Sequence, residues 1–112
     1  MRTVKSLSAA IDEARKHGDL IHITREANPH LEIAAIARTT DAGPMVLFDK
    51  IRGHEGRRIV TNIFSDRKRI ARWCGIDPID LPRRIADAAL NPIASRETTD
   101  AASQQNVITS GI

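Results

Sequence analysis

The sequence predicts a small α+β fold (mixed α/β), with a sheet of about three strands flanked by helices. Segments whose apolar residues have helical spacing alternate with short runs rich in β-branched residues, in the order helix, strand, helix, strand, strand, helix, helix. The 112 residues are 41% hydrophobic but only 3% aromatic, so we expect one domain with a single aliphatic core.

The first part of the chain predicts a helix, a strand and a second helix. Ser6 is the expected N-cap of the first helix, and Gly18 ends it. Residues 20–24 form a strand-like run, and Asn28-Pro29 predicts a turn before a helix at residues 31–40. The apolar residues of the first helix are Leu7, Ala10, Ile11 and Ala14. The apolar face of the second helix is expected to contain Leu31, Ala34, Ala35 and Ile36.

The middle of the chain predicts a β-hairpin. Residues 45–49 and residues 58–64 are the two strand-like runs, and a turn bounded by Gly53 and Gly56 lies between them. This turn is not a phosphate-binding loop, because it lacks the Lys-Ser/Thr of a P-loop and does not open a helix.

Two more helices follow the hairpin. We expect Ser65 to cap a helix at residues 66–74, with Ile70 and Trp73 facing inward and Gly75 stopping the helix. A last helix is expected at about residues 81–90, with Asp80 as its cap.

After the last helix the chain becomes polar and loses helical spacing. We therefore divide it into an α/β domain at residues 1–92 and a linker at residues 93–112. Val107, Ile108 and Thr109 resemble the start of a connecting strand, which would need a partner strand for its backbone.

Composition excludes several classes of protein. The single cysteine, Cys74, excludes an internal disulfide and a cysteine-based zinc site. The apolar runs are too short to cross a membrane, and the first ten residues lack a secretory signal, so we expect a soluble cytoplasmic protein. The scarcity of aromatic residues argues against a stacking platform for nucleic acid.

No catalytic, cofactor-binding or metal-binding residue is assigned from the sequence. His17, His22, His30 and His54 are not spaced as ligands on one helix, and we expect them to be surface residues. The carboxylate pairs Asp12/Glu13 and Glu26/Glu32 have no predicted burial that would separate their pKa values. Asp12 and Glu13 are interpreted as a solvated helix face. Cys74 is interpreted as a buried structural thiol at the wrong end of a helix for activation.

Positive charge is concentrated in residues 57–84. This stretch has eight basic residues against three acidic ones, a local net charge of +5, and it includes Arg67-Lys68-Arg69. Such a stretch can contact phosphate groups or an acidic protein surface, or it can be a solvated helix face.

Four collinear segments resemble a known family. These are HGDLIHITREANPHLEIAAIAR (residues 17–38), AGPMVLFDKIRGHE (42–55), RIVTNIFSDRKRIARWCGID (58–77) and QQNVITSG (104–111). The first matches a pattern of a G-(D/E)-L turn, a strand and D/N-P-x-L-E before a helix. The next two resemble GPALLFENVKG and PVVTNLFGSRERIALALGLD. Together they resemble the N-terminal domain of UbiD-type decarboxylases, which use prenylated FMN to add or remove carboxylate on aromatic and α,β-unsaturated acids.

The resemblance implies that the chemistry lies outside this chain. In the family, the prenylated flavin, a divalent metal, potassium and the catalytic residues belong to a large domain that follows this one. The expected role is therefore that of an N-terminal domain or small non-catalytic subunit, whose partner is a larger UbiD-like catalytic domain. It would contribute packing and the rim of the active site. The alternative is a small basic module that binds nucleic acid or an anionic protein.

Overall fold

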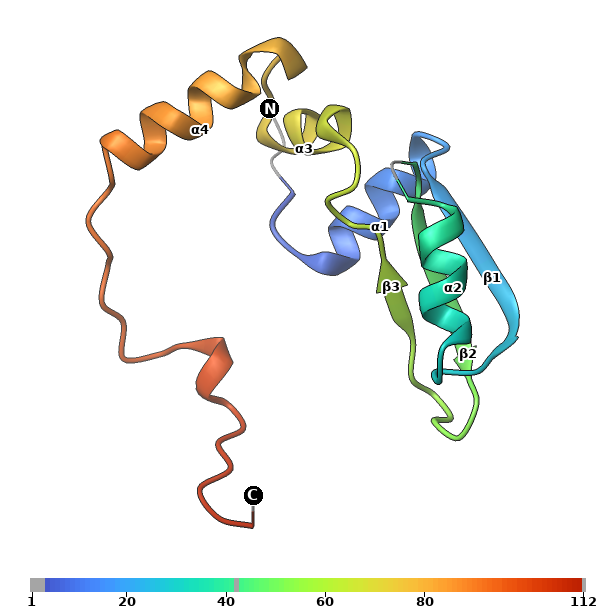
Figure 1. Ribbon diagram of the computed structural model, residues 1–112. Coiled ribbons are helices and arrows are strands. Elements are labelled where there is room, and N and C mark those ends of the chain that lie inside the picture. The colour runs from blue at the N-terminus through green and yellow to red at the C-terminus, as the bar shows by residue number, and fades with distance from the viewer. Residues whose placement is uncertain (1–3, 42, 112) are drawn as a thin grey trace.

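The computed structural model describes residues 4–41 and 43–111 and contains a three-stranded sheet with helices on both faces (Figure 1). The strands are β1 (Leu20–Ala27), β2 (Met45–Ile51) and β3 (Ile59–Thr61), in that spatial order. β1 and β2 are parallel, whereas β2 and β3 form the predicted antiparallel hairpin. The mixed α/β fold predicted from the sequence is confirmed.

The central strand β2 forms the middle of the core. Its first four residues, Met45 to Phe48, are each at most 1% exposed, because one layer of side chains packs on each face of the sheet. A strand that is covered on both faces needs apolar residues at consecutive positions, which explains the unbroken run at its start.

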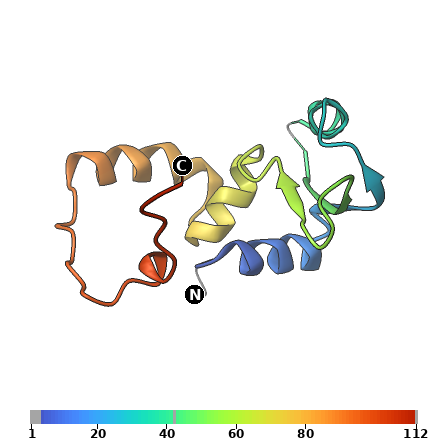
Figure 2. The same ribbon diagram turned by 90° about the horizontal axis from the view of Figure 1, so that it is seen from below.

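The two faces of the sheet are covered by different helices. α1 (Leu7–Lys16) packs Ile11 and Ala14 against the face that carries Met45 and Leu47. α2 (Glu32–Thr39) covers the opposite face, that of Val46 and Phe48, and Figure 2 shows the two helices on opposite sides of the sheet.

The predicted apolar face of α2 was largely wrong. Ile33 is buried and Ile36 is half-buried against the core, whereas Leu31, Ala34 and Ala35 are exposed. The helix begins only at Glu32, because Leu31 has a left-handed backbone with φ of 67°. Ile33 and Ile36, three residues apart, then face the sheet together.

Local end signals placed the first and third helices well. The Ser6 side chain accepts a hydrogen bond from the Ala9 backbone N–H, so it caps α1 as predicted. α3 (Arg67–Cys74) ends at Gly75 in the left-handed conformation, also as predicted. Its cap is Asp66 rather than Ser65, because the Asp66 carboxylate accepts from the Lys68 backbone N–H.

The last helix, α4 (Leu81–Leu90), has the predicted bounds but a different beginning. The short 3₁₀ turn η1 (Pro78–Asp80) precedes it, and Asp77 caps this turn by accepting from the Ile79 N–H. Asp80 makes no side-chain cap to α4, so the prediction of that cap was wrong.

The outer strands differ in length from their predictions. β1 is longer than expected and contains a bulge between Ile23 and Glu26, where its register against β2 shifts. β3 is shorter, because Asn62 adopts a positive φ of 59° and turns the chain away from the sheet.

Beyond α4 the described chain is extended. It contains only the 3₁₀ turn η2 (Ala102–Gln104), and residues 107–109 do not form the predicted strand. The radius of gyration is 17.4 Å, whereas a compact domain of this length has about 13 Å. The division into residues 1–92 and 93–112 stays a prediction.

Candidate functional site

A fully buried arginine joins three parts of the fold. Arg69 on α3 donates from Nε and Nη2 to the two carboxylate oxygens of Asp19, at 2.7 and 2.9 Å. Gly18, at a φ of 66°, ends α1 and brings Asp19 to the beginning of β1. The remaining guanidinium N–H groups donate to the backbone carbonyls of Asn62, Ile63 and Gly43 at 2.8 to 3.0 Å.

Glu13 on α1 forms a second contact with α3. Its carboxylate accepts from Arg72 and, at 2.8 Å, from the indole Nε1–H of Trp73. Arg72 also donates to Asp19 at 3.3 Å. The five side chains Glu13, Asp19, Arg69, Arg72 and Trp73 therefore form one polar cluster between α1 and α3.

The electrostatics of this cluster hold both carboxylates in their charged form. Partial burial by itself would raise the pKa of Glu13, but hydrogen bonds from Arg72 and Trp73 and the nearby positive charges outweigh it and lower the pKa. The hydrogen bonds from Arg69 lower the pKa of Asp19 despite its partial burial. The hydrogen bond to Glu13 raises the pKa of Arg72. A cluster of fixed charges that satisfy one another suits a structural joint rather than proton transfer.

Two of the sequence interpretations are wrong at this cluster. Glu13 does not belong to a solvated face, although Asp12 beside it is exposed and pairs with Arg15 at 3.1 Å. Arg69 is not part of a solvated basic face. The partner, Asp19, lies 50 residues away in the sequence, so no local pattern reveals the pair. The available signal was the spacing of Arg69, which stands four residues before Trp73 and so shares the helix side already expected to face inward.

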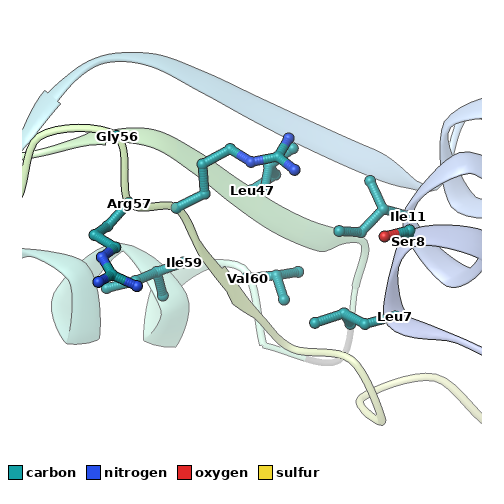
Figure 3. A pocket seen from close by; sticks show the side chains of 9 residues that line it. Leu7, Ser8, Ile11, Leu47, Gly56, Arg57, Ile59 and Val60 are labelled. Atoms are coloured by element: carbon teal, nitrogen blue, oxygen red, sulfur yellow. The ribbon is translucent and has the colours of Figure 1, made fainter. Parts of the chain in front are cut away.

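An open groove of about 330 Å³ lies between α1 and the β2–β3 hairpin (Figure 3). Its apolar lining comes from both sides: Leu7 and Ile11 on α1, and Leu47, Ile59 and Val60 on the strands. Arg57 and Arg58, both exposed, also line it. An apolar floor beside two guanidinium groups suits contact with an acidic, partly apolar surface.

A second open cleft of about 700 Å³ lies at the hairpin turn. Its polar lining residues are Glu26, Asp49, Lys50, His54 and Glu55. Glu26 pairs with Arg52 at 3.0 Å, and the Asp49 carboxylate is hydrogen-bonded to His22. Among the residues that the structure describes, no group of three or more His, Cys, Asp or Glu is placed to hold a metal ion.

The other sequence candidates are dispersed over the surface. The four histidines are exposed, as predicted, at the end of α1 (His17), on β1 (His22), before α2 (His30) and in the hairpin turn (His54). Glu32 accepts from the Asn28 backbone N–H and pairs with Arg25, and these contacts lower its pKa, so it stabilises the start of α2. Cys74 is exposed, so the prediction of a buried thiol was wrong.

The basic stretch is partly neutralised inside the fold. Arg69 and Arg72 are paired with carboxylates in the cluster, and Arg83 lies 3.9 Å from Asp87 along α4. The remaining basic residues of the stretch are exposed, namely Arg57, Arg58, Arg67, Lys68 and Arg84. They are spread over the hairpin turn, α3 and α4 rather than following one helix, which weakens the alternative of a nucleic-acid module.

These observations define a class of protein: a small α+β domain whose polar cluster is structural and whose apolar surface is partly uncovered. A family model described as the 3-octaprenyl-4-hydroxybenzoate carboxy-lyase N-terminal domain matches residues 11–89. The chain therefore belongs to the UbiD family, as its N-terminal domain. In the described residues, no helix is both long and apolar enough to cross a lipid bilayer.

Solved structures agree with this family. The UbiD-class enzyme HmfF of Pelotomaculum thermopropionicum, in an evolved dimeric form with prFMN, is 26% identical, with a TM-score of 0.76 over 83% of this chain and 22% of that chain. The 3,4-dihydroxybenzoic acid decarboxylase of Enterobacter cloacae is 26% identical, with a TM-score of 0.73 over 83% and 21%. The vanillic acid decarboxylase of Sedimentibacter hydroxybenzoicus, in its open form, is 28% identical, with a TM-score of 0.65 over 75% and 20%.

An uncharacterized protein of Aeropyrum pernix is 31% identical over 84 residues, which cover 72% of this chain and 17% of that protein. The chain thus spans about a fifth of the length of these relatives. HmfF has been solved with prFMN and with FMN, so a flavin cofactor is a feature of the family.

Proposed function

We propose that this chain serves a UbiD-type decarboxylase of aromatic or α,β-unsaturated carboxylic acids as a non-catalytic N-terminal domain or small subunit. It contributes packing and the rim of the active site, while the reaction takes place in a larger catalytic domain. The observation that carries this proposal is the pattern of coverage: HmfF matches 83% of this chain with only 22% of its own chain. The polar cluster supports it, because its charges are used to join α1 to α3.

The relatives support the substrate class. The Enterobacter cloacae and Sedimentibacter hydroxybenzoicus enzymes are decarboxylases of 3,4-dihydroxybenzoic and vanillic acid, and the family model is named after a hydroxybenzoate. We therefore propose a substituted benzoic acid as the first substrate to test for the complete enzyme.

The cofactors are proposed to reside in the catalytic domain. They are prenylated FMN, a divalent metal and potassium. Among the described residues, no group of three or more His, Cys, Asp or Glu is placed to hold the divalent metal. The glycine-containing turn between β2 and β3 joins two strands instead of opening a helix, so it offers no phosphate site at a helix N-terminus.

Isolation of the chain from its own host tests this proposal. A chain tagged at its N-terminal end is purified under native conditions, and native mass spectrometry with peptide identification defines what accompanies it. We expect either a complex with a UbiD-class polypeptide or one longer polypeptide that contains both parts. In both cases the flavin absorbance should follow the larger species. A flavin-free chain that travels alone, or with proteins of other classes, would contradict the proposal.

A further inference from the structure

The last part of the described chain packs very little against the rest of the molecule. Every residue from Pro82 to Gly111 is exposed except Ala101, which is half-buried. Figure 1 shows α4 and the following segment extending away from the sheet as an arm. Large apolar side chains are included, namely Ile85, Leu90, Ile93, Val107 and Ile108, and Ile93 is 95% exposed.

The helix in this arm has an apolar stripe that continues the core outward. Leu81, Ile85, Ala88 and Ala89 fall on one helical face. Leu81 is buried at the base of the helix, whereas Ile85, one turn further along, is 60% exposed. α4 packs mainly against η1. A ten-residue helix is marginal without tertiary packing, so a partner on this stripe would stabilise it.

Two of the three charged residues of α4 lie on its opposite face, whereas Arg84 lies beside Ala88, at the edge of the stripe. Arg83 and Asp87 pair with each other one turn apart and lie about half a turn around the helix from Leu81 and Ile85. The stripe can therefore be removed from water without burying this ion pair. Ala88 and Ala89 would allow the backbone of a partner to approach closely.

The exposed area is large enough for a stable interface. The chain exposes 9155 Å², whereas a compact monomer of 12.3 kDa exposes about 6,100 Å². The excess of roughly 3,000 Å² is well above the ~800 Å² per partner that a standard interface buries.

We infer that residues 81–111 form a docking arm whose α4 stripe seats on the catalytic domain of a UbiD-class enzyme. This inference rests on the proposed function. The occupant follows from the coverage, since the solved enzymes carry about four fifths of their chains outside the part that this chain matches. A second copy of this chain is the competing occupant.

A matched pair of substitutions separates the stripe from the rest of the helix. Ala88→Glu places a carboxylate on the stripe, and Ala86→Glu places the same group about half a turn around α4 from Ala88. Both positions are exposed in the chain itself, so circular dichroism should show both variants folded. In the host-derived assembly, Ala88→Glu should weaken association by at least about tenfold, because the added carboxylate must be taken out of water at the interface even if Arg84, one turn before it, pairs with it. Ala86→Glu should leave association unchanged. If this domain and the catalytic domain share one polypeptide, the measurement is instead the hydrogen-exchange rate of the α4 amides in each variant.

Hydrogen exchange gives the second measurement. The amides of α4 should exchange at least about tenfold more slowly in the assembly than in the isolated 112-residue chain, and Ala88→Glu should remove this protection. If a UbiD-class assembly forms and the two variants behave alike, the docking arm is wrong while the proposed function stands. If no UbiD-class polypeptide is found, the proposed function itself fails. A dimer of the isolated chain that Ala88→Glu dissolves would assign the stripe to a second copy and overturn the inference.

Discussion

Arg69 shows how one buried charge can hold a small domain together. Its guanidinium is 0% exposed, yet its donors reach either the Asp19 carboxylate or a backbone carbonyl. Removing an arginine from water is expensive, and only such complete pairing compensates for it. The carbonyls belong to the segments before β2 and after β3, so one side chain fixes the relative positions of α1, α3 and the sheet.

Substitution of Arg69 by alanine should therefore be strongly destabilising. We expect Arg69→Ala to lower the free energy of unfolding by about 3 kcal/mol, because it removes the bidentate partner of Asp19 and one donor from each of three backbone carbonyls. Urea unfolding followed by circular dichroism measures this change. Arg67→Ala removes an exposed arginine from the first position of the same helix. It should change the free energy of unfolding by less than about 0.5 kcal/mol. Equal losses in the two variants would disprove the role given to the cluster.

The same cluster predicts that acid destabilises the fold. The pKa values of Glu13 and Asp19 are lowered in the folded state, so their contribution is fully present above the ordinary values of 4.5 and 3.8 and is lost as the pH falls through the folded values. Thermal unfolding should show a constant stability from pH 7 to about pH 5.5 and a decline below. Asp19→Asn should flatten this decline, whereas Glu97→Gln, in the exposed tail, should not. Stability that rises on acidification would contradict this assignment.

At the scale of single elements, signals from neighbouring residues allowed good prediction. Ser6, Gly18 and Gly75 mark the ends of α1 and α3 because capping and left-handed termination need only adjacent backbone groups. The inward face of α2 and the length of β3 were not predicted. Both depend on backbone turns at Leu31 and Asn62, which have positive φ angles. Neither residue is a glycine, the residue type from which a positive φ is predicted.

The partners within the polar cluster were beyond prediction for a different reason. Asp19 and Arg69 are 50 residues apart in the sequence and are brought together by the tertiary fold, and each resembles an ordinary surface residue in its own segment. The tail was also misjudged in part, since Val107 and its neighbours have strand-like composition but no strand beside them in the described chain.

The beginning of α2 gives a prediction about stability, at its N-cap residue Leu31. It is 70% exposed and has a φ of 67°, a conformation that strains a residue with a side chain. Leu31→Gly should stabilise the isolated chain by about 1 kcal/mol, because the relief of strain exceeds the added entropy of the unfolded state. Ala34→Gly, at an exposed position inside α2, should cost about 1 kcal/mol. Chemical unfolding of both variants measures the contrast; two losses of similar size would refute the strain at Leu31.

At the scale of the whole molecule, the chain is a folded body with an extended arm. The body consists of the sheet with α1, α2 and α3, and α4 begins the arm (Figures 1 and 2). The radius of gyration and the excess exposed area both come from this shape. The chain covers about a fifth of the length of the related enzymes, and this independent observation agrees with the exposed arm. A domain of a larger enzyme, taken alone, is expected to leave its docking surface uncovered.

Release of carbon dioxide tests the central claim most directly. The homogeneous 112-residue chain and the assembly isolated from its host are each incubated with 3,4-dihydroxybenzoate and with vanillate, and CO2 is measured alongside bound flavin. We predict that the assembly holds flavin and releases CO2 from a carboxylic acid of this class, whereas the chain alone holds no flavin and releases none. Flavin retention with turnover by the isolated chain would contradict the account.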